Sequence, residues 1–427
     1  MQSHHFKERP IAWNLEVPNL RHLRMVQLIG KIGGVNGAAR ALSTSQPAVT
    51  QAVSNIEADI GAPLFDRCAS GSFPTDHGKQ FLLRVDRFFD ILDAAVGRVL
   101  TWRTEGPEVN EPQADRLITN TQLRSFVVAC ETGRVREIAQ SLGLTDASLF
   151  RSARSLERVL GNSLFDRTAS GPVPNKTGKR LARDFGRALR EIELARGEVR
   201  FSMGRESLEI VVGVPPLPGS HELVRATRDF MIAFPKVKLR FVTGEYQKLL
   251  RDLSSGHLDL MFGILRLPEW VDDLQEEVLY DDDSCVITRP MHPLILRDRV
   301  TPEDLAQYDW LVPPPGTPRR ARIEAIFEGS ATSPLFSIET ASLSLSRAFL
   351  LGSDAITLMA RSEIQHELDL GLLAAISFKL SDQKQPKGLT TRVDWLPTQA
   401  HRAFIECLRV ATAVQSSANP AKCKLGA

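Results

Sequence analysis

Apolar residues recur every three to four positions from Leu23 onward, which predicts an amphipathic helix near the start of the chain. We expect it to end near Gly33, because glycine readily adopts the left-handed conformation that closes many helices. Two further helices are predicted over residues 36–42 and 46–59, and a short hairpin over residues 66–74. Three helices followed by a hairpin indicate a small helical domain with a wing.

A much longer helix is predicted directly after the hairpin, from about residue 75 to residue 102. At 1.5 Å per residue, about 25 residues make a rod of roughly 38 Å. A domain of this size cannot cover such a rod, so we expect another helix to pack along its apolar stripe. The stripe consists of Phe81, Val85, Phe88, Phe89, Leu92, Val96 and Leu100.

The same pattern occurs again 100 residues later. Between residues 20–90 and 120–190, 19 of 71 positions are identical, and Leu64-Phe-Asp-Arg-Cys-Ala-Ser-Gly recurs as Leu164-Phe-Asp-Arg-Thr-Ala-Ser-Gly. We therefore predict one small domain in two copies. The second copy has its own long helix at about residues 177–201, with an apolar stripe of Leu181, Phe185, Leu189, Ile192 and Val199.

From Glu206 the pattern changes to short apolar runs that alternate with helical segments. The runs at residues 208–213, 238–242 and 258–263 predict strands, and residues 400–413 predict a closing helix. Alternation of this kind favours a parallel sheet with crossover helices. The second half of the chain is therefore expected to be an α/β domain.

The outward face of the third helix is polar but almost uncharged, with amides and hydroxyls between Gln46 and Asn55. A helix face in contact with water usually carries more charge, whereas a face that reads base edges favours amides and hydroxyls. An ordinary helix of small residues would give the same pattern. The face alone therefore leaves both interpretations open.

Together these stretches resemble the winged helix-turn-helix of LysR-type transcriptional regulators. The resemblance covers residues 19–103 and is carried by Asn19-Leu-Arg-His-Leu23, Gly37-Ala-Ala-Arg-Ala-Leu42, Ser45-Gln-Pro-Ala-Val-Thr-Gln-Ala-Val53, Glu57, Gly61-Ala-Pro-Leu-Phe-Asp-Arg67 and Thr75-Asp-His-Gly78. The second half resembles the effector domain of the same family. The second DNA-binding unit departs from the family pattern, in which one is usual.

The resemblance implies a multidomain fold: two α-rich winged helix-turn-helix units with long linker helices, then an α/β, two-lobed, periplasmic-binding-protein-like effector domain. We place the first unit at residues 18–103, a connector at 104–115, the second unit at 116–204, the effector domain at 205–415 and a tail at 416–427. Lobe one would comprise about 206–283 and 388–415, and lobe two about 284–387.

The resemblance also indicates which residues contact DNA. In the first unit they are Ser45, Gln46, Pro47, Thr50, Gln51 and Ser54, with Arg67 on phosphate. In the second unit they are Ser148, Arg151, Arg154 and Arg167. Asp146, at the start of the second recognition helix, would repel DNA phosphates. The alternative to DNA contact is that the second unit serves only to pack against the first.

Members of this family dimerise through their linker helices, which places two recognition helices in neighbouring major grooves. Two units in one chain could pair within that chain, as a covalent pseudo-dimer, or between chains. We favour pairing within the chain, and the sequence leaves the other arrangement open. Because the two copies differ, the preferred DNA site would then be asymmetric.

Ligands of open α/β sheets bind in the crevice beyond the carboxyl ends of the strands. This rule predicts an effector site formed by Ser220, Thr243, Gly244, Tyr246, Leu265, Pro314, Gly316, Thr317 and Ser342. Amides at helix starts favour an anion such as a carboxylate, although each hydroxyl alone could equally be a helix cap. By the family resemblance, the effector is a small carboxylate, an aromatic acid or a sugar derivative.

The net charge of +2 conceals an uneven distribution. Residues 1–103 carry 12 Lys and Arg against 9 Asp and Glu, residues 116–205 carry 17 against 9, and residues 206–427 carry 24 against 29. A basic first half suggests a polyanionic partner, with nucleic acid the leading candidate. The family resemblance implies the specific partners: double-stranded promoter DNA, a small-molecule effector, RNA polymerase and further copies of the chain.

Several classes of protein are disfavoured. The chain has no P-loop, GxSxG, HExxH or dinucleotide motif, so we expect no enzyme. Its five cysteines form no CxxC pair, so neither a disulfide framework nor a zinc site is expected, nor any cofactor. Without a long apolar stretch or a signal sequence, a cytoplasmic protein that contacts no membrane is expected.

Two alternative functions stay open at this point. One is a ligand-binding protein whose helical half is a protein-interaction module that pairs with another regulator. The other is a solute-binding transport protein, which the absence of a signal sequence disfavours.

Overall fold

The computed structural model describes residues 17–417, except 69–70, 102–112, 131–144, 170, 206, 216–219, 331, 333, 335, 337, 341 and 381–383. The chain folds as two compact units. The N-terminal unit runs to Ile210 and includes residues 236–238 and 251–258. The C-terminal unit comprises residues 211–235, 239–250 and the chain from Asp259 onward.

The first copy of the repeat has the predicted elements. They are α1 (Leu20–Ile32), α2 (Val35–Ala41), α3 (Gln46–Ile60), the antiparallel wing strands β1 (Phe65–Cys68) and β2 (Gly71–Pro74), and α4 (Asp76–Thr101). Gly33 closes α1 in the left-handed conformation, with φ 85°. Ser45 is the N-cap of α3, and its side chain accepts a hydrogen bond from the Ala48 amide. Both helix ends were predicted from these residues.

The second copy repeats this order. It consists of α5 (Ala114–Leu117), α6 (Asn120–Cys130), α8 (Asp146–Leu160), the antiparallel strands β3 (Phe165–Thr168) and β4 (Gly171–Pro174), and α9 (Lys176–Ser202). The short helix expected between α6 and α8 falls on residues 131–144, outside the described residues. The predicted second rod is α9.

Two of the repeated identities have the same structural role in both copies. One is a glutamate of the third helix, which accepts hydrogen bonds from the amides at the start of the wing. The Glu57 carboxylate lies 2.7 Å from the Leu64 amide nitrogen, and the Glu157 carboxylate lies 2.7 Å from that of Leu164. The other is the glycine in the first turn of each rod, which lies close to the backbone at the start of the wing. A Cβ added at Gly78 would lie 2.0 Å from the Leu64 carbonyl oxygen, and one added at Gly178 would lie 2.2 Å from that of Leu164.

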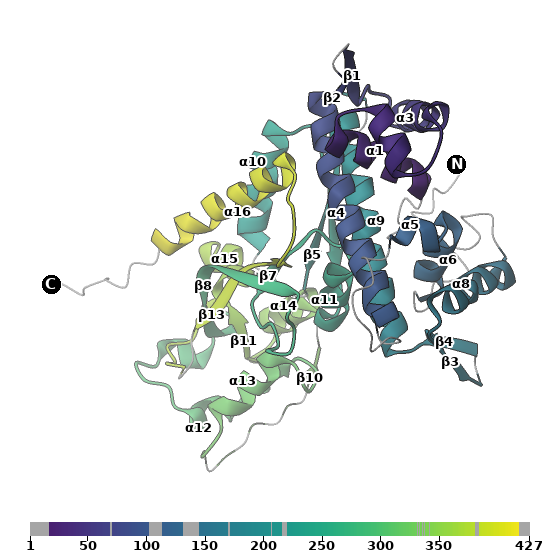
Figure 1. Ribbon diagram of the computed structural model, residues 1–427. Helices are drawn as coiled ribbons and strands as arrows, with labels where there is room; N and C mark the ends of the chain where they lie inside the picture. Colours follow the sequence, from purple (N-terminus) through teal and green to yellow (C-terminus); the bar gives the residue numbers. More distant parts are fainter. Residues whose placement is uncertain are drawn as a thin grey trace, which may run out of the picture. The chain divides into compact units, whose positions relative to one another are not determined.

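The two rods, α4 and α9, lie side by side within the N-terminal unit (Figure 1). They run antiparallel, since Arg84 of α4 pairs with Glu198 of α9 while Arg98 pairs with Asp184. Their apolar stripes belong to one hydrophobic core that extends from Leu20 to Val199. In this structure, the second rod of the same chain packs along the first rod, which is the arrangement favoured from the sequence.

The C-terminal unit is built on a mixed sheet. Its strands are β5 (Glu209–Val214), β6 (Lys238–Thr243), β7 (Leu260–Ile264), β8 (Leu274–Thr288), β11 (Thr357–Ala360), β12 (Ala374–Ala375) and β13 (Lys384–Arg392). The strand order is β11-β8-β13-β7-β5-β6, and β12 pairs with β8. A separate parallel pair is formed by β9 (Leu311–Val312) and β10 (Ile338–Glu339).

The prediction of a parallel sheet was only partly right. β5 and β7 are parallel as expected, but β13 runs antiparallel to both β7 and β8, and β11 runs antiparallel to β8. Hydrophobic alternation reports on single strands, whereas β8 and β13 pair across more than 100 residues of sequence. These two long strands connect the first part of the sheet with the second.

Seven helices and one 3₁₀ turn complete the described part of this unit. They are α10 (Ser220–Ala233), α11 (Tyr246–Ser254), η1 (Pro293–Leu296), α12 (Pro302–Leu305), α13 (Pro318–Ile326), α14 (Leu343–Gly352), α15 (Arg361–Asp369) and α16 (Gln399–Ser417). The closing helix predicted over residues 400–413 is α16. Among the helices that the structure describes, none is long and apolar enough to cross a membrane.

Candidate functional site

The third helix, α3, presents the predicted polar face to solvent. Ser45, Gln46, Pro47, Gln51 and Ser54 are exposed, and Thr50 is half-buried. The opposite face packs Val49, Val53 and Ile56 into the core. The Gln51 side-chain amide donates a hydrogen bond to the Asn55 side chain at 2.8 Å, which orients it along the helix surface. All of these side chains except Pro47 offer hydroxyl or amide groups that can hydrogen-bond to base edges.

The corresponding helix of the second copy, α8, carries cations instead. Arg151 and Arg154 are exposed on α8, and Arg167 is exposed on β3. Ser148 belongs to a capping box, because its hydroxyl donates to the Thr145 carbonyl oxygen at 2.8 Å and its amide donates to the Thr145 hydroxyl. Its hydroxyl proton is thus engaged within the helix cap. Arg67 lies on β1, and its side chain is outside the described residues.

A cleft of about 460 Å³ opens in the C-terminal unit beyond the carboxyl ends of β5, β6, β7 and β9. This is the position that the strand rule predicts for a ligand site. The cleft is lined by Pro215, Glu245, Tyr246, Gln247, Gly263, Ile264, Arg266, Pro313, Pro314, Gly316, Thr317, Pro318, Arg319 and Gln385.

Of the nine residues predicted for the effector site, four line this cleft: Tyr246, Pro314, Gly316 and Thr317. The cleft lining does not include Thr243, Gly244, Leu265 or Ser342. Thr243 is exposed, Gly244 is half-buried, Leu265 is buried in the core, and Ser342 caps α14 through the Leu345 amide. Ser220 begins α10, and its side chain is outside the described residues.

One wall of the cleft pairs a cation with an aromatic ring. The Arg266 guanidinium carbon lies 4.1 Å from the centre of the Tyr246 ring. The Tyr246 hydroxyl is buried and has no hydrogen-bond partner among the described residues. Burial raises the pKa of Tyr246 to about 12, so the phenol stays protonated at neutral pH. It can therefore donate a hydrogen bond to a ligand oxygen.

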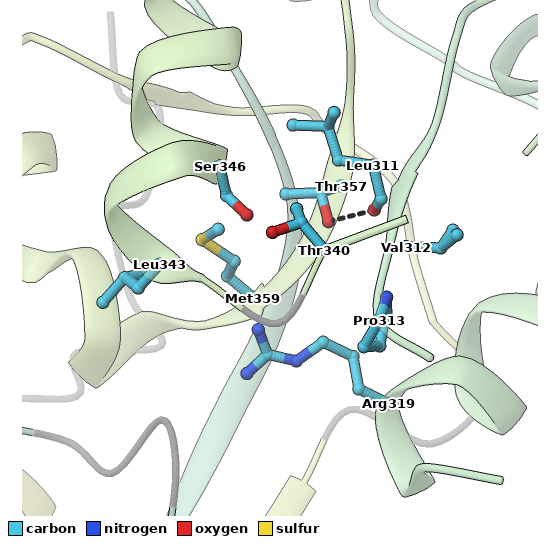
Figure 2. Close-up of a pocket in the computed structure, with 9 residues that line it drawn as sticks. All are labelled: Leu311, Val312, Pro313, Arg319, Thr340, Leu343, Ser346, Thr357 and Met359. Atoms are coloured by element: carbon cyan, nitrogen blue, oxygen red, sulfur yellow. Dashed lines mark hydrogen bonds between the residues drawn. The ribbon is translucent and has the colours of Figure 1, made fainter. Parts of the chain in front are cut away.

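The cleft is also lined by a second arginine, Arg319 at the start of α13. Its guanidinium donates to both oxygens of the Glu363 carboxylate, at 2.6 and 2.7 Å, and Glu363 is 2% exposed. Figure 2 shows the Arg319 guanidinium beside a small pocket of about 10 Å³, in which the Thr357 hydroxyl donates to the Leu311 carbonyl oxygen. Arg319 lines both this pocket and the larger cleft.

The strand rule also nominated the loop formed by Leu265 and Arg266, and Arg266 lines the cleft. The sequence prediction missed Arg319 and Gln385. Arg319 lies two residues after the predicted Thr317, so a wider window along that loop would have included it. Gln385 lies on β13, whose pairing with β8 no local pattern indicated. In the part of the chain that the structure describes, no group of three or more His, Cys, Asp or Glu residues is placed to hold a metal ion.

Family models match most of the chain. The LysR substrate binding domain matches residues 204–413. The bacterial regulatory helix-turn-helix protein model of the lysR family matches twice, at residues 20–79 and 120–179. The chain belongs to the LysR family. It is a DNA-binding transcriptional regulator controlled by a small-molecule effector, as the sequence motifs predicted.

The chain is similar to several known proteins. The HTH-type transcriptional regulator GalR of Pseudomonas putida is 29% identical over 397 residues, 93% of this chain and 98% of GalR. The SDS degradation transcriptional activation protein of a Pseudomonas species is 30% identical over 64% of this chain and 89% of its own. The crystal structure of CbnR, a LysR family transcriptional regulator, is 16% identical over 68% of this chain and 98% of its own, with a TM-score of 0.47. The GalR match is long enough to include both copies of the repeat.

Proposed function

We propose that one chain of this regulator contacts promoter DNA with both of its winged units. The observation that supports this is the antiparallel pairing of α4 and α9 within one chain. A rod of 26 residues such as α4 is about 39 Å long, close to the 34–36 Å or so between successive major-groove half-sites. A single chain would then provide what other regulators obtain from two chains.

The two units would read DNA in different ways. In the first, Ser45, Gln46, Pro47, Thr50, Gln51 and Ser54 would contact base edges and Arg67 the phosphate backbone. In the second, Arg151 and Arg154 would reach bases or phosphates from α8, and Ser148 and Arg167 would support them. Asp146 also suits the positive end of the helix dipole at the start of α8, which is compatible with DNA contact. The preferred site is then a pair of unlike half-sites.

The cleft would bind the effector. Arg266 supplies positive charge, the Arg319 guanidinium, which is already paired with Glu363, adds N–H donors, and the Tyr246 hydroxyl is a buried donor without a protein partner among the described residues. These groups favour a small carboxylate, an aromatic acid or a sugar derivative that carries an acid. The protein would act in the cytoplasm by binding rather than catalysis, as a homo-oligomer that influences RNA polymerase.

The test is a footprint on the DNA upstream of the gene and its neighbours. The wild-type protein is compared with the double variant Arg151→Ala, Arg154→Ala. We expect the variant to lose one half of an asymmetric footprint and to keep the half that α3 reads. A control pair, Arg228→Ala with Arg402→Ala, removes two exposed arginines of the C-terminal unit and should leave both halves protected. An unchanged footprint in the α8 variant would refute DNA contact by the second unit.

A further inference from the structure

The ion pairs between the two rods obey the symmetry of the repeat. The Arg84 guanidinium lies 3.0 Å from the Glu198 carboxylate, and the Arg98 guanidinium lies 2.7 Å from the Asp184 carboxylate. Because the copies are offset by 100 residues, Arg84 corresponds to Asp184 and Arg98 to Glu198. Both contacts therefore join the same two repeat positions, once in each direction across a pseudo-twofold axis.

The charges at these two positions are segregated by copy. The first copy has arginine at both, Arg84 and Arg98, and the second has a carboxylate at both, Asp184 and Glu198. A rod of the first copy paired in this geometry with another rod of the first copy would bring Arg84 opposite Arg98 twice. Two rods of the second copy would bring Asp184 opposite Glu198 twice. Only the mixed pair matches opposite charges at both contacts.

The residue on the pseudo-twofold axis adds to this discrimination. Ile91 of the first copy corresponds to Glu191 of the second, and Glu191 is 6% exposed. Its carboxylate lies 2.8 Å from the Arg84 guanidinium and 3.3 Å from that of Arg87. Two second-copy rods would place two such carboxylates at the axis. Like charges in a buried position are strongly unfavourable.

Burial makes these charges matter more than surface ion pairs would. One partner of each pair is buried, since the Arg84 side chain is 2% exposed and the Asp184 side chain 5%, while the side chains of Glu198 and Arg98 are 23% and 44% exposed. Burial alone would lower the pKa of Arg84, but the carboxylates of Glu191 and Glu198 outweigh it, so this pKa lies above its ordinary value. Exposed ion pairs contribute little, whereas a buried charge that loses its partner is costly.

We propose that these charges restrict rod pairing to one first-copy helix and one second-copy helix. Each pair of rods, and each pair of winged units that it carries, is thus always mixed. The rod of one copy selects its partner by charge and rejects a second rod of its own kind, including that of another chain. The family members described above pair the identical linker helices of two chains. In this protein, the two different rods α4 and α9 pair instead.

A charge exchange in the full-length protein tests this. Arg98→Glu places an acid opposite Asp184, and Asp184→Arg places a base opposite Arg98. We expect each single variant to lower the unfolding midpoint of the N-terminal unit by about 2–4 °C. The double variant restores opposite charges and should recover at least half of the loss. Arg183 and Arg187 lie near Asp184 and limit the recovery.

Arg98→Glu has a second expected result. Two first-copy rods that carry this substitution, one from each of two chains, could now pair. Arg84 of each rod would then lie opposite the new carboxylate of the other rod. The mass of the main species in native mass spectrometry should then rise relative to the wild type, and return in the double variant. Arg180→Glu, an exposed charge reversal on α9, is the control and should change neither readout. If the double variant loses as much as the two single variants together, or if Arg98→Glu changes nothing, the proposal is wrong.

Discussion

At the residue scale, the C-terminal unit buries a carboxylic acid that its neighbours only partly compensate. Glu222 on α10 is 3% exposed, and one of its carboxylate oxygens has no hydrogen-bond partner among the described residues. Burial raises the pKa of Glu222; Lys387 and His221 lower it, and Asp282 raises it further. The folded protein therefore favours the protonated form of Glu222 more than the unfolded chain does.

This shift predicts how stability depends on pH. A carboxyl whose pKa is raised by folding stabilises the protein below its unfolded pKa, and that contribution is lost as the pH rises through the folded pKa. Glu222→Gln removes the titration, so we expect the variant to be more stable than the wild type at pH 7. The gain should shrink towards pH 4. Urea unfolding at both pH values measures this gain in the free energy of unfolding. The control is Asp229→Asn, at an exposed position on the same helix. An equal gain for Glu222→Gln at both pH values would contradict a raised pKa of Glu222 in the folded protein.

Gln51 is the residue of α3 for which base recognition can be tested most directly. It is exposed and held along the helix by Asn55, so its removal should not disturb the core. We expect Gln51→Ala to weaken the specific site by about 1–3 kcal/mol and to leave non-specific DNA unchanged. Arg67→Ala should weaken all DNA about equally and lower the salt slope by about one. Competition titrations at several salt concentrations separate base recognition by Gln51 from phosphate contact by Arg67. If both variants lost specific and non-specific binding equally, these two roles would be wrong.

At the scale of elements, the helices of the N-terminal unit were predictable because their signals are local. Gly33 and Ser45 mark helix ends through their own backbone or side chain, and the stripe from Phe81 to Leu100 required a long partner. The sheet was less predictable. Leu274–Thr288 forms one strand of 15 residues, although its sequence alternates only in part, because β13 and β11 pair with it from distant segments.

The start of each rod gives an element-scale prediction. A Cβ at Gly78 would lie 2.0 Å from the Leu64 carbonyl oxygen, and a Cβ at Gly178 would lie 2.2 Å from that of Leu164. Because backbone atoms can yield only if the helix moves, Gly78→Ala or Gly178→Ala should destabilise the N-terminal unit by about 1–3 kcal/mol. Gly352→Ala has no atom within 4 Å of its new Cβ and is the control. Denaturant unfolding decides, and a loss no larger than that of the control would show that the wing adjusts freely.

At the scale of the whole molecule, the sequence predicted the architecture better than the ligand site. The repeat, the rods and the change to an α/β pattern are properties of long stretches, so they survive errors at single positions. The cleft depends on loops that come together from four strands. Four of its residues were predicted by the strand rule, but Arg319 owes its position to Glu363, 44 residues away. No pattern along the chain reports such a contact.

The mixed rod pair leads to a prediction about the promoter. If unlike units are always paired, the preferred DNA site has two different half-sites, one for α3 and one for α8. Perfect palindromes built from either half alone should bind more weakly than the natural site, since one unit then meets the wrong half. Each mismatched base pair typically costs about 1–3 kcal/mol. Titration of the three DNAs at one salt concentration measures these affinities.

The Arg151→Ala, Arg154→Ala variant provides the matched control: it should lose most of the discrimination between the natural site and the palindrome of α3 half-sites. A palindrome that binds the wild type as tightly as the natural site would show that only one kind of unit reads DNA.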